Sequence, residues 1–131
     1  MKEITLSLQF ISKAASISEI EEITKLEYLP CSRNVGDVGP NGIVYRETKA
    51  VFCEQTDTSD LFAMMDCMVH KIADIQFDSF RKIISGLSIV LDVCVFFDTM
   101  DCSVSIAPRH AEFFGRNNID IDISCYPSTD I

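Results

Sequence analysis

The 131-residue chain contains no tryptophan, only five glycines and four prolines, and no two cysteines at the C-x-x-C spacing. The low glycine and proline content excludes a collagen-like or low-complexity chain, and the missing spacing leaves no zinc-ribbon or thioredoxin-type motif. Basic residues are also scarce, because 20 acids outnumber 11 lysines and arginines and give a net charge of −9. Such a surface repels phosphates, so we expect neither nucleic acid nor an anionic membrane as direct partner.

Long apolar segments and targeting signals are missing as well. Ser88 and Asp92 interrupt the longest apolar stretch, so no segment is expected to span a membrane. The first residues do not join a basic start to a long apolar run, as secretory signals do. A chain of this size also folds without disulfide staples. We therefore predict a cytoplasmic protein with six free thiols: Cys31, Cys53, Cys67, Cys94, Cys102 and Cys125.

Hydropathy patterns predict one α+β domain over residues 1–131. Of the residues, 47% are hydrophobic, and segments with the two-residue period of strands are interspersed with segments that have the 3.6-residue period of helices. Strands are expected over 4–10, 43–54, 87–97, 102–107 and 119–126, and helices after the caps Ser16, Thr58 or Ser59, and Asp78, and from Pro108. The order β-α-β-α-α-β-β-α-β favours two layers, with helices on one face of a mainly antiparallel sheet. A turn over 98–101 should join the strands 87–97 and 102–107 as an antiparallel hairpin.

Turn residues concentrate in the segment 30–42, which is long for a loop in a compact domain. Its glycines Gly36, Gly39 and Gly42 do not follow the G-x-G-x-x-G spacing of a dinucleotide site, and Pro40 removes a backbone amide from any phosphate cradle. We interpret the segment as a turn-rich loop with a functional or dynamic role.

No motif predicts an enzyme. His110 and Glu112 match half of the zinc deaminase signature, but the P-C-x-x-C half is missing. We therefore expect both side chains on the solvated face of a helix. The cysteines fall mostly at apolar positions, where a free thiol packs as a small hydrophobe. We expect no catalytic residue, no cofactor and no metal.

Several aspartates lie at positions of the predicted strands, where aspartate is disfavoured, and this indicates a candidate binding surface. Asp92, Asp120 and Asp122 alternate with apolar residues, which places them on the open face of the sheet among hydroxyl side chains. Asp98 and Asp101 flank the expected hairpin turn. Residues 51–131 hold 13 acids and 5 bases, so the acidity is concentrated there. These five aspartates are the candidate partner-binding residues; a solvated face that only keeps the sheet soluble is the alternative.

The C-terminal part of the sequence resembles that of a known protein family. The run Phe113-Phe114-Gly115, followed by the alternating strand from Ile119 to Tyr126, is similar to the end of a small bacterial domain family of uncharacterised function. Similar small acidic proteins occur as immunity proteins of contact-dependent or polymorphic toxins. The resemblance implies a non-enzymatic protein that neutralises a cognate basic toxin domain, such as a nuclease, in a stoichiometric complex. The alternatives are a small-molecule or regulatory binding domain that uses the loop 30–42 and the adjacent sheet, and an unrecognised enzyme.

Overall fold

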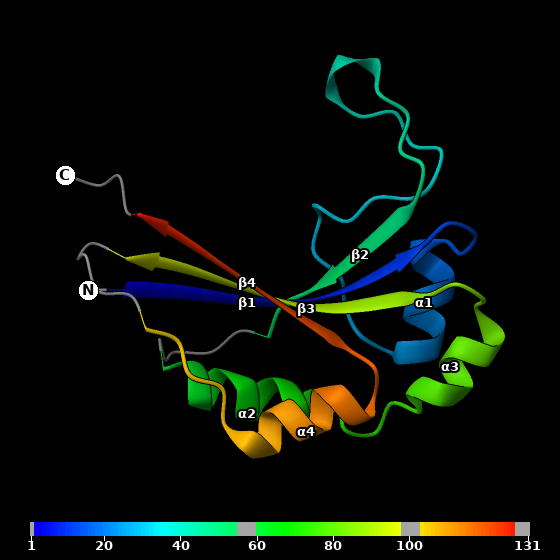
Figure 1. Cartoon of the computed structure of the whole chain (residues 1–131). Coiled ribbons are helices and arrows are strands. Elements are labelled where there is room, and N and C mark those ends of the chain that lie inside the picture. Colours follow the sequence, from blue (N-terminus) through cyan, green and yellow to red (C-terminus); the bar gives the residue numbers. More distant parts are fainter. Residues whose placement is uncertain (1, 55–59, 98–102, 128–131) are drawn as a thin grey trace. The chain divides into compact units, whose positions relative to one another are not determined.

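The computed structural model of the chain contains a four-stranded sheet in the order β2-β1-β3-β4 together with four α-helices (Figure 1). It describes residues 2–54, 60–97 and 103–127. The elements are β1 (Lys2–Ser12), α1 (Ile17–Thr24), the 3-10 turn η1 (Pro40–Gly42), β2 (Thr48–Phe52), α2 (Leu61–Ile72), α3 (Phe77–Ile83), β3 (Ser88–Phe97), α4 (Pro108–Arg116) and β4 (Asp120–Pro127). This arrangement confirms the predicted α+β class. None of the described helices is long and apolar enough to cross a bilayer.

The chain divides into two compact units, and β1 and β3 each contribute to both. The α2–α4 unit comprises Met1–Ser7, Glu54–Asp74 and Leu91–Ile131, and the α1–α3 unit comprises Leu8–Cys53 and Ile75–Val90. The two units are described separately below.

The core of the α1–α3 unit forms around Phe10 of β1. Its ring stacks on Phe80 of α3 with the ring centroids 5.7 Å apart, and it meets the ring of Tyr28 edge-on at 6.0 Å. Strand β1 pairs antiparallel with β2 from Leu8 opposite Phe52 to Ser12 opposite Thr48. The alternation predicted for the first strand is confirmed, because its even-numbered residues from position 4 to position 12 are all buried.

Helix α1 begins where the capping signal predicts. The Ser16 side chain accepts a hydrogen bond from the Glu19 amide at 3.2 Å, which satisfies one of the donors that a helix leaves open at its start. The helix ends at Thr24, because Lys25 adopts a left-handed conformation with φ of 60°. Helix α3 starts differently from the prediction. Gln76 occupies its cap position, and Asp78 lies in its first turn.

The predicted loop 30–42 and the start of the predicted strand 43–54 form a single ordered hairpin over residues 33–49, which we call the arm. Arg33 and Lys49 exchange backbone hydrogen bonds at the base of the arm. Nearer its tip, the Gly36 amide donates a hydrogen bond to the Tyr45 carbonyl. The Arg33 guanidinium also lies 4.3 Å above the Tyr45 ring centre. Local turn bonding therefore holds this segment, and β2 begins only at Thr48.

In the α2–α4 unit, helix α2 buries the methionine stripe that its 3.6-residue period predicts. Leu61, Met64, Met65, Met68 and Ile72 are all buried. Its cap is Asp60, whose side chain accepts from the Phe62 amide at 3.2 Å. The predicted caps Thr58 and Ser59 lie outside the described residues.

The strand predicted over residues 102–107 is wrong. Residues 103–107 form no strand, and Cys102 lies outside the described part of the chain. Strand β3 already has β1 on one side and β4 on the other, so no edge of β3 is available for a hairpin partner. Strands β3 and β4 run in the same direction (Figure 1), and parallel neighbours need a crossover rather than a tight turn. Residues 103–107 lead into that crossover, which helix α4 completes.

Candidate functional site

One face of the sheet in the α2–α4 unit carries all three candidate aspartates that the structure describes. Leu91, Val93 and Val95 of β3 are buried, so the alternate residues Asp92, Cys94 and Phe96 point to the opposite, open face. The Phe96 ring stacks on the Tyr126 ring with the centroids 5.7 Å apart. Tyr126 therefore lies on the same face as Phe96. Because residues two apart on a strand share a face, every second residue of β4 counted back from Tyr126 lies on this face as well. The open face therefore carries Asp92, Cys94 and Phe96 of β3 and Asp120, Asp122, Ser124 and Tyr126 of β4.

The three described aspartates differ in exposure. Asp120 and Asp122 are exposed, while Asp92 is half-buried and accepts a hydrogen bond from the Cys94 thiol at 3.5 Å. Burial, together with the charge of Asp92, raises the pKa of that thiol above its usual value. A side-chain hydrogen bond with Thr5 of β1 acts in the opposite direction. Asp98 and Asp101, the other two candidates, lie outside the described residues.

An aromatic pair on the open face was missed by the sequence reasoning. Phe96 and Tyr126 are 37% and 49% exposed although their rings stack. Large exposed aromatic side chains of this kind are enriched at protein interfaces, where they supply contact area with few rotatable bonds. The sequence does contain a signal for this pair. Phe96 follows Asp92, and Tyr126 follows Asp122, by an even number of residues, which predicts that each aromatic residue shares a strand face with its aspartate. The open face therefore carries an aromatic pair at the strand ends and carboxylates nearer the strand starts.

Strand β4 is more exposed than its alternation predicts. An alternation that places Asp120 and Asp122 on the open face turns the intervening isoleucines toward the core, yet Ile121 is only half-buried and Ile123 is 44% exposed. Ile119, just before the strand, is buried. Helix α4 leads directly into the start of β4, so burial is confined to that end. The far half of β4 is open to solvent on both faces.

A second cluster links α2 to α4. His110 was expected on a solvated face, but only 2% of it is exposed, and its Nε2 lies 2.8 Å from Asp66 Oδ1. The Arg109 guanidinium lies 2.6 and 2.8 Å from the two oxygens of the same carboxylate. It also covers the Phe62 ring, 4.7 Å from its centre. The hydrogen bond from His110 and the charge of Arg109 hold the pKa of Asp66 below its usual value.

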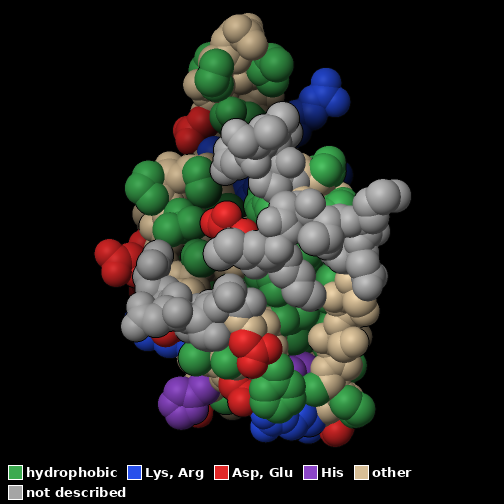
Figure 2. Space-filling model, turned by 90° about the vertical axis from the view of Figure 1, so that its left-hand side faces the viewer, with side chains coloured by type: hydrophobic (Ala, Val, Ile, Leu, Met, Phe, Trp, Pro, Cys, Tyr) green, Lys and Arg blue, Asp and Glu red, His purple; other side chains and the backbone are tan. Residues whose placement is uncertain are grey.

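This cluster is a structural tie between helices. The ionised Asp66 carboxylate only accepts hydrogen bonds, so His110 Nε2 carries the proton. His110 Nδ1 is buried without a hydrogen-bond partner among the described residues. A buried ring nitrogen cannot reach a substrate in solvent, and Glu112 on the exposed side of α4 faces Arg116 at 3.8 Å. Figure 2 shows acidic and basic side chains adjoining at its lower end, where α2 and α4 lie.

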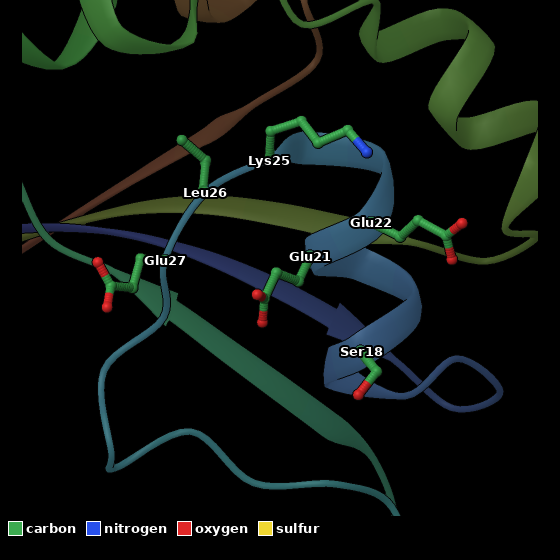
Figure 3. Close-up of a pocket in the computed structure, with 6 residues that line it drawn as sticks. All are labelled: Ser18, Glu21, Glu22, Lys25, Leu26 and Glu27. Atoms are coloured by element: carbon green, nitrogen blue, oxygen red, sulfur yellow. The ribbon is translucent and has the colours of Figure 1, made fainter.

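A groove of about 540 Å³ in the α2–α4 unit follows the start of α2 and the approach to α4. Its walls are Ile4, Asp60, Leu61, Phe62 and residues 103–108. A second, shallow hollow of about 530 Å³ lies over α1 in the other unit, lined by Ser18, Glu21, Glu22, Lys25, Leu26 and Glu27 (Figure 3). Its glutamates point to different sides and do not converge on one point. Within the described residues, no three acidic, histidine or cysteine side chains are placed to hold a metal ion.

The arm ends in an exposed apolar tip. Val38 and Ile43 are 68% and 63% exposed, and hydrophobic side chains are visible at the top of Figure 2, where the arm lies. These residues lie on either side of the turn of η1. The tip is a second exposed apolar surface, after the aromatic pair of the open face.

Comparison with known proteins adds no family assignment. No protein-family model, no curated protein sequence and no solved structure matches this chain. The resemblance to immunity proteins therefore stays a prediction.

Proposed function

We propose that this protein is a non-enzymatic immunity protein that neutralises a basic toxin domain, such as a nuclease, by covering it in a stoichiometric complex. The observation that supports this function is the composition of the open face: the exposed pair Phe96 and Tyr126 shares this face with Asp92, Asp120 and Asp122, which lie nearer the starts of the two strands. Specific protein interfaces are enriched in aromatic side chains and carry polar and charged side chains at their rims.

Charge gives this face a preference among partners. The chain has a net charge of −9, and Asp120 and Asp122 carry exposed carboxylates on the open face. A partner rich in lysine and arginine would be steered toward these carboxylates, which raises the association rate at low salt. Catalytic domains that act on nucleic acid are such partners, because they must attract phosphates. A stoichiometric block requires a specific interface and no chemistry.

The two kinds of residue should contribute differently. Exposed charge pairs at a rim contribute under about 1 kcal/mol each to the binding free energy. Replacing an aromatic residue that is buried in an interface by alanine often costs about 2–4 kcal/mol. Phe96 and Tyr126 are therefore expected to control the dissociation rate. Asp120 and Asp122 are expected to control the association rate.

Co-expression tests the function directly. The protein encoded by the gene immediately upstream should arrest growth when expressed alone, and this chain should restore growth and co-purify with it in a fixed ratio. The double variant Asp120→Lys, Asp122→Lys should slow association in stopped-flow measurements, most strongly at low salt. The matched control is Asp74→Lys, Asp78→Lys, which reverses two exposed acids at helix ends.

Each outcome decides one element of the proposal. If the upstream protein is harmless or does not bind, the immunity function is wrong. If it binds at a rate that neither salt nor the Asp120 and Asp122 reversals change, the acidic docking face is wrong. If the helix-end control slows association equally, the effect comes from net charge and not from the open face.

A further inference from the structure

The two ends of the strand order differ in what lies beside them. Beside β2, residues 29–33 of the chain follow the strand: the Leu29 amide donates to Val51 at 2.8 Å, and Arg33 and Lys49 exchange backbone bonds. The Val51 amide donates to the Ser32 hydroxyl at 2.9 Å. Strand β4 ends the order on the other side, and among the described residues its only strand neighbour is β3.

Strand β4 is well suited to accept a further strand. It is eight residues long, and none of its residues is buried. An edge strand presents a row of backbone donors and acceptors that pair readily with another extended chain. Its side chains follow a strict alternation, with Asp120 and Asp122 on one face and Ile121 and Ile123 on the other.

We propose that β4 binds an extended segment of the partner by strand addition, and that this segment alternates basic with apolar residues. Basic side chains on one face would lie beside Asp120 and Asp122, where opposite charges on neighbouring strands attract. Apolar side chains on the other face would cover Ile121 and Ile123, which are incompletely buried in this chain. This inference rests on the proposed function, because it takes the partner to be basic.

A second copy of the chain is a poorer occupant. Pairing β4 with another β4 would bring two sets of Asp120 and Asp122 into one small interface, between molecules that each carry a charge of −9. Like charges on paired strands are destabilising. The charge of β4 therefore favours a basic strand over self-association.

A designed peptide tests the strand addition without the natural partner. The probe is an acetylated and amidated octapeptide in which lysine and valine alternate, and the matched control has the same composition with four lysines followed by four valines. The alternating peptide should shift the amide resonances of residues 120–124 and slow their hydrogen exchange. It should bind at least about tenfold more tightly than the control, because a strand with its lysines and valines in two blocks cannot match several cross-strand side-chain pairs on both faces of β4.

Backbone methylation separates strand pairing from charge attraction. Two further peptides carry N-methyl groups on alternate amides, one on the odd positions and one on the even. Because a strand directs alternate amides to opposite sides, only one of the two should lose binding by about tenfold or more. The variant Asp120→Asn, Asp122→Asn should weaken the alternating peptide and flatten its salt dependence, while Asp74→Asn, Asp78→Asn should not.

The results distinguish this inference from the proposed function. Strand addition is overturned if both methylated peptides bind like the parent, if the block control binds as tightly, or if the shifts fall outside β4. In that case, only the binding experiments with the upstream protein test the open face. Dimerisation of the chain through β4, seen by sedimentation, would also overturn it. If the peptide pairs with β4 but the upstream protein does not bind, the immunity function falls while β4 remains a strand-binding edge.

Discussion

His110 donates a hydrogen bond from Nε2 to Asp66 Oδ1 over 2.8 Å and thereby joins helix α4 to helix α2. Arg109, the preceding residue, holds the same carboxylate from its solvent side. The pair explains why a polar ring is tolerated at a position that is 98% buried, since 2% of His110 is exposed. Most buried polar groups in folded proteins are hydrogen-bonded, and Nε2 of His110 meets this requirement through Asp66.

Removing the Asp66 carboxylate should weaken the α2–α4 tie in a pH-dependent way. The pKa of Asp66 is lower in the folded chain than its usual value, so its stabilising effect is present above the pKa of the unfolded state and is lost as pH falls through the folded value. Asp66→Asn should therefore lower the free energy of unfolding at pH 7, and the deficit should shrink below about pH 4. Urea denaturation at both pH values measures this. Asp74→Asn is the control, and an equal deficit at every pH would contradict the prediction.

Cys94 should react more slowly than the exposed thiols of the described residues. Burial and the neighbouring Asp92 raise its pKa, and the thiolate is the reactive form. Iodoacetamide at pH 8 should label Cys31, Cys67 and Cys125, which are exposed, before Cys94. Asp92→Asn should accelerate Cys94, whereas Asp78→Asn should not. Mass spectrometry of digested samples gives the rates, and denatured, unreduced protein should show all six thiols free.

Truncating Phe10 should destabilise the α1–α3 unit strongly. The Phe10 ring is fully buried between Phe80 and Tyr28, and Phe→Ala in such a core costs about 3–5 kcal/mol. Ile83→Ala removes a side chain that is mostly exposed and should change the free energy of unfolding by less than about 0.5 kcal/mol. Chemical denaturation of both variants provides the comparison. A similar loss in both would show that Phe10 does not anchor the core.

A methyl group at Gly39 should disturb the arm. A Cβ placed there would lie 2.7 Å from Cζ of Tyr45, which is closer than carbon atoms approach, so the ring must move. Gly39→Ala should release Tyr45 from the Arg33 guanidinium and speed amide exchange at Gly36 and Tyr45, whose backbone groups are hydrogen-bonded. The double variant Gly39→Ala, Tyr45→Ala removes the clash. If the single variant leaves these exchange rates unchanged, the close approach of Tyr45 does not restrain the arm.

The sequence determined the features that depend on neighbours along the chain. The alternation of β1 and β3 and the helical period of α2 follow from hydrophobic spacing, and Ser16 caps α1 because its hydroxyl reaches an amide three residues away. The same spacing placed Asp120 and Asp122 on one face of their strand. These interactions are local, so residue types and their order are sufficient to predict them.

Tertiary structure decided the features that depend on competition between distant segments. Residues 103–107 alternate like a strand, but β1 and β4 occupy both sides of β3. His110 is buried because Asp66, which lies 44 residues earlier, provides its hydrogen bond. The stack of Phe96 on Tyr126, and the open position of β4 at the end of the sheet, likewise arise from which strands pair. Strand pairing is a choice among segments far apart in sequence, and the local pattern of any one segment does not contain it.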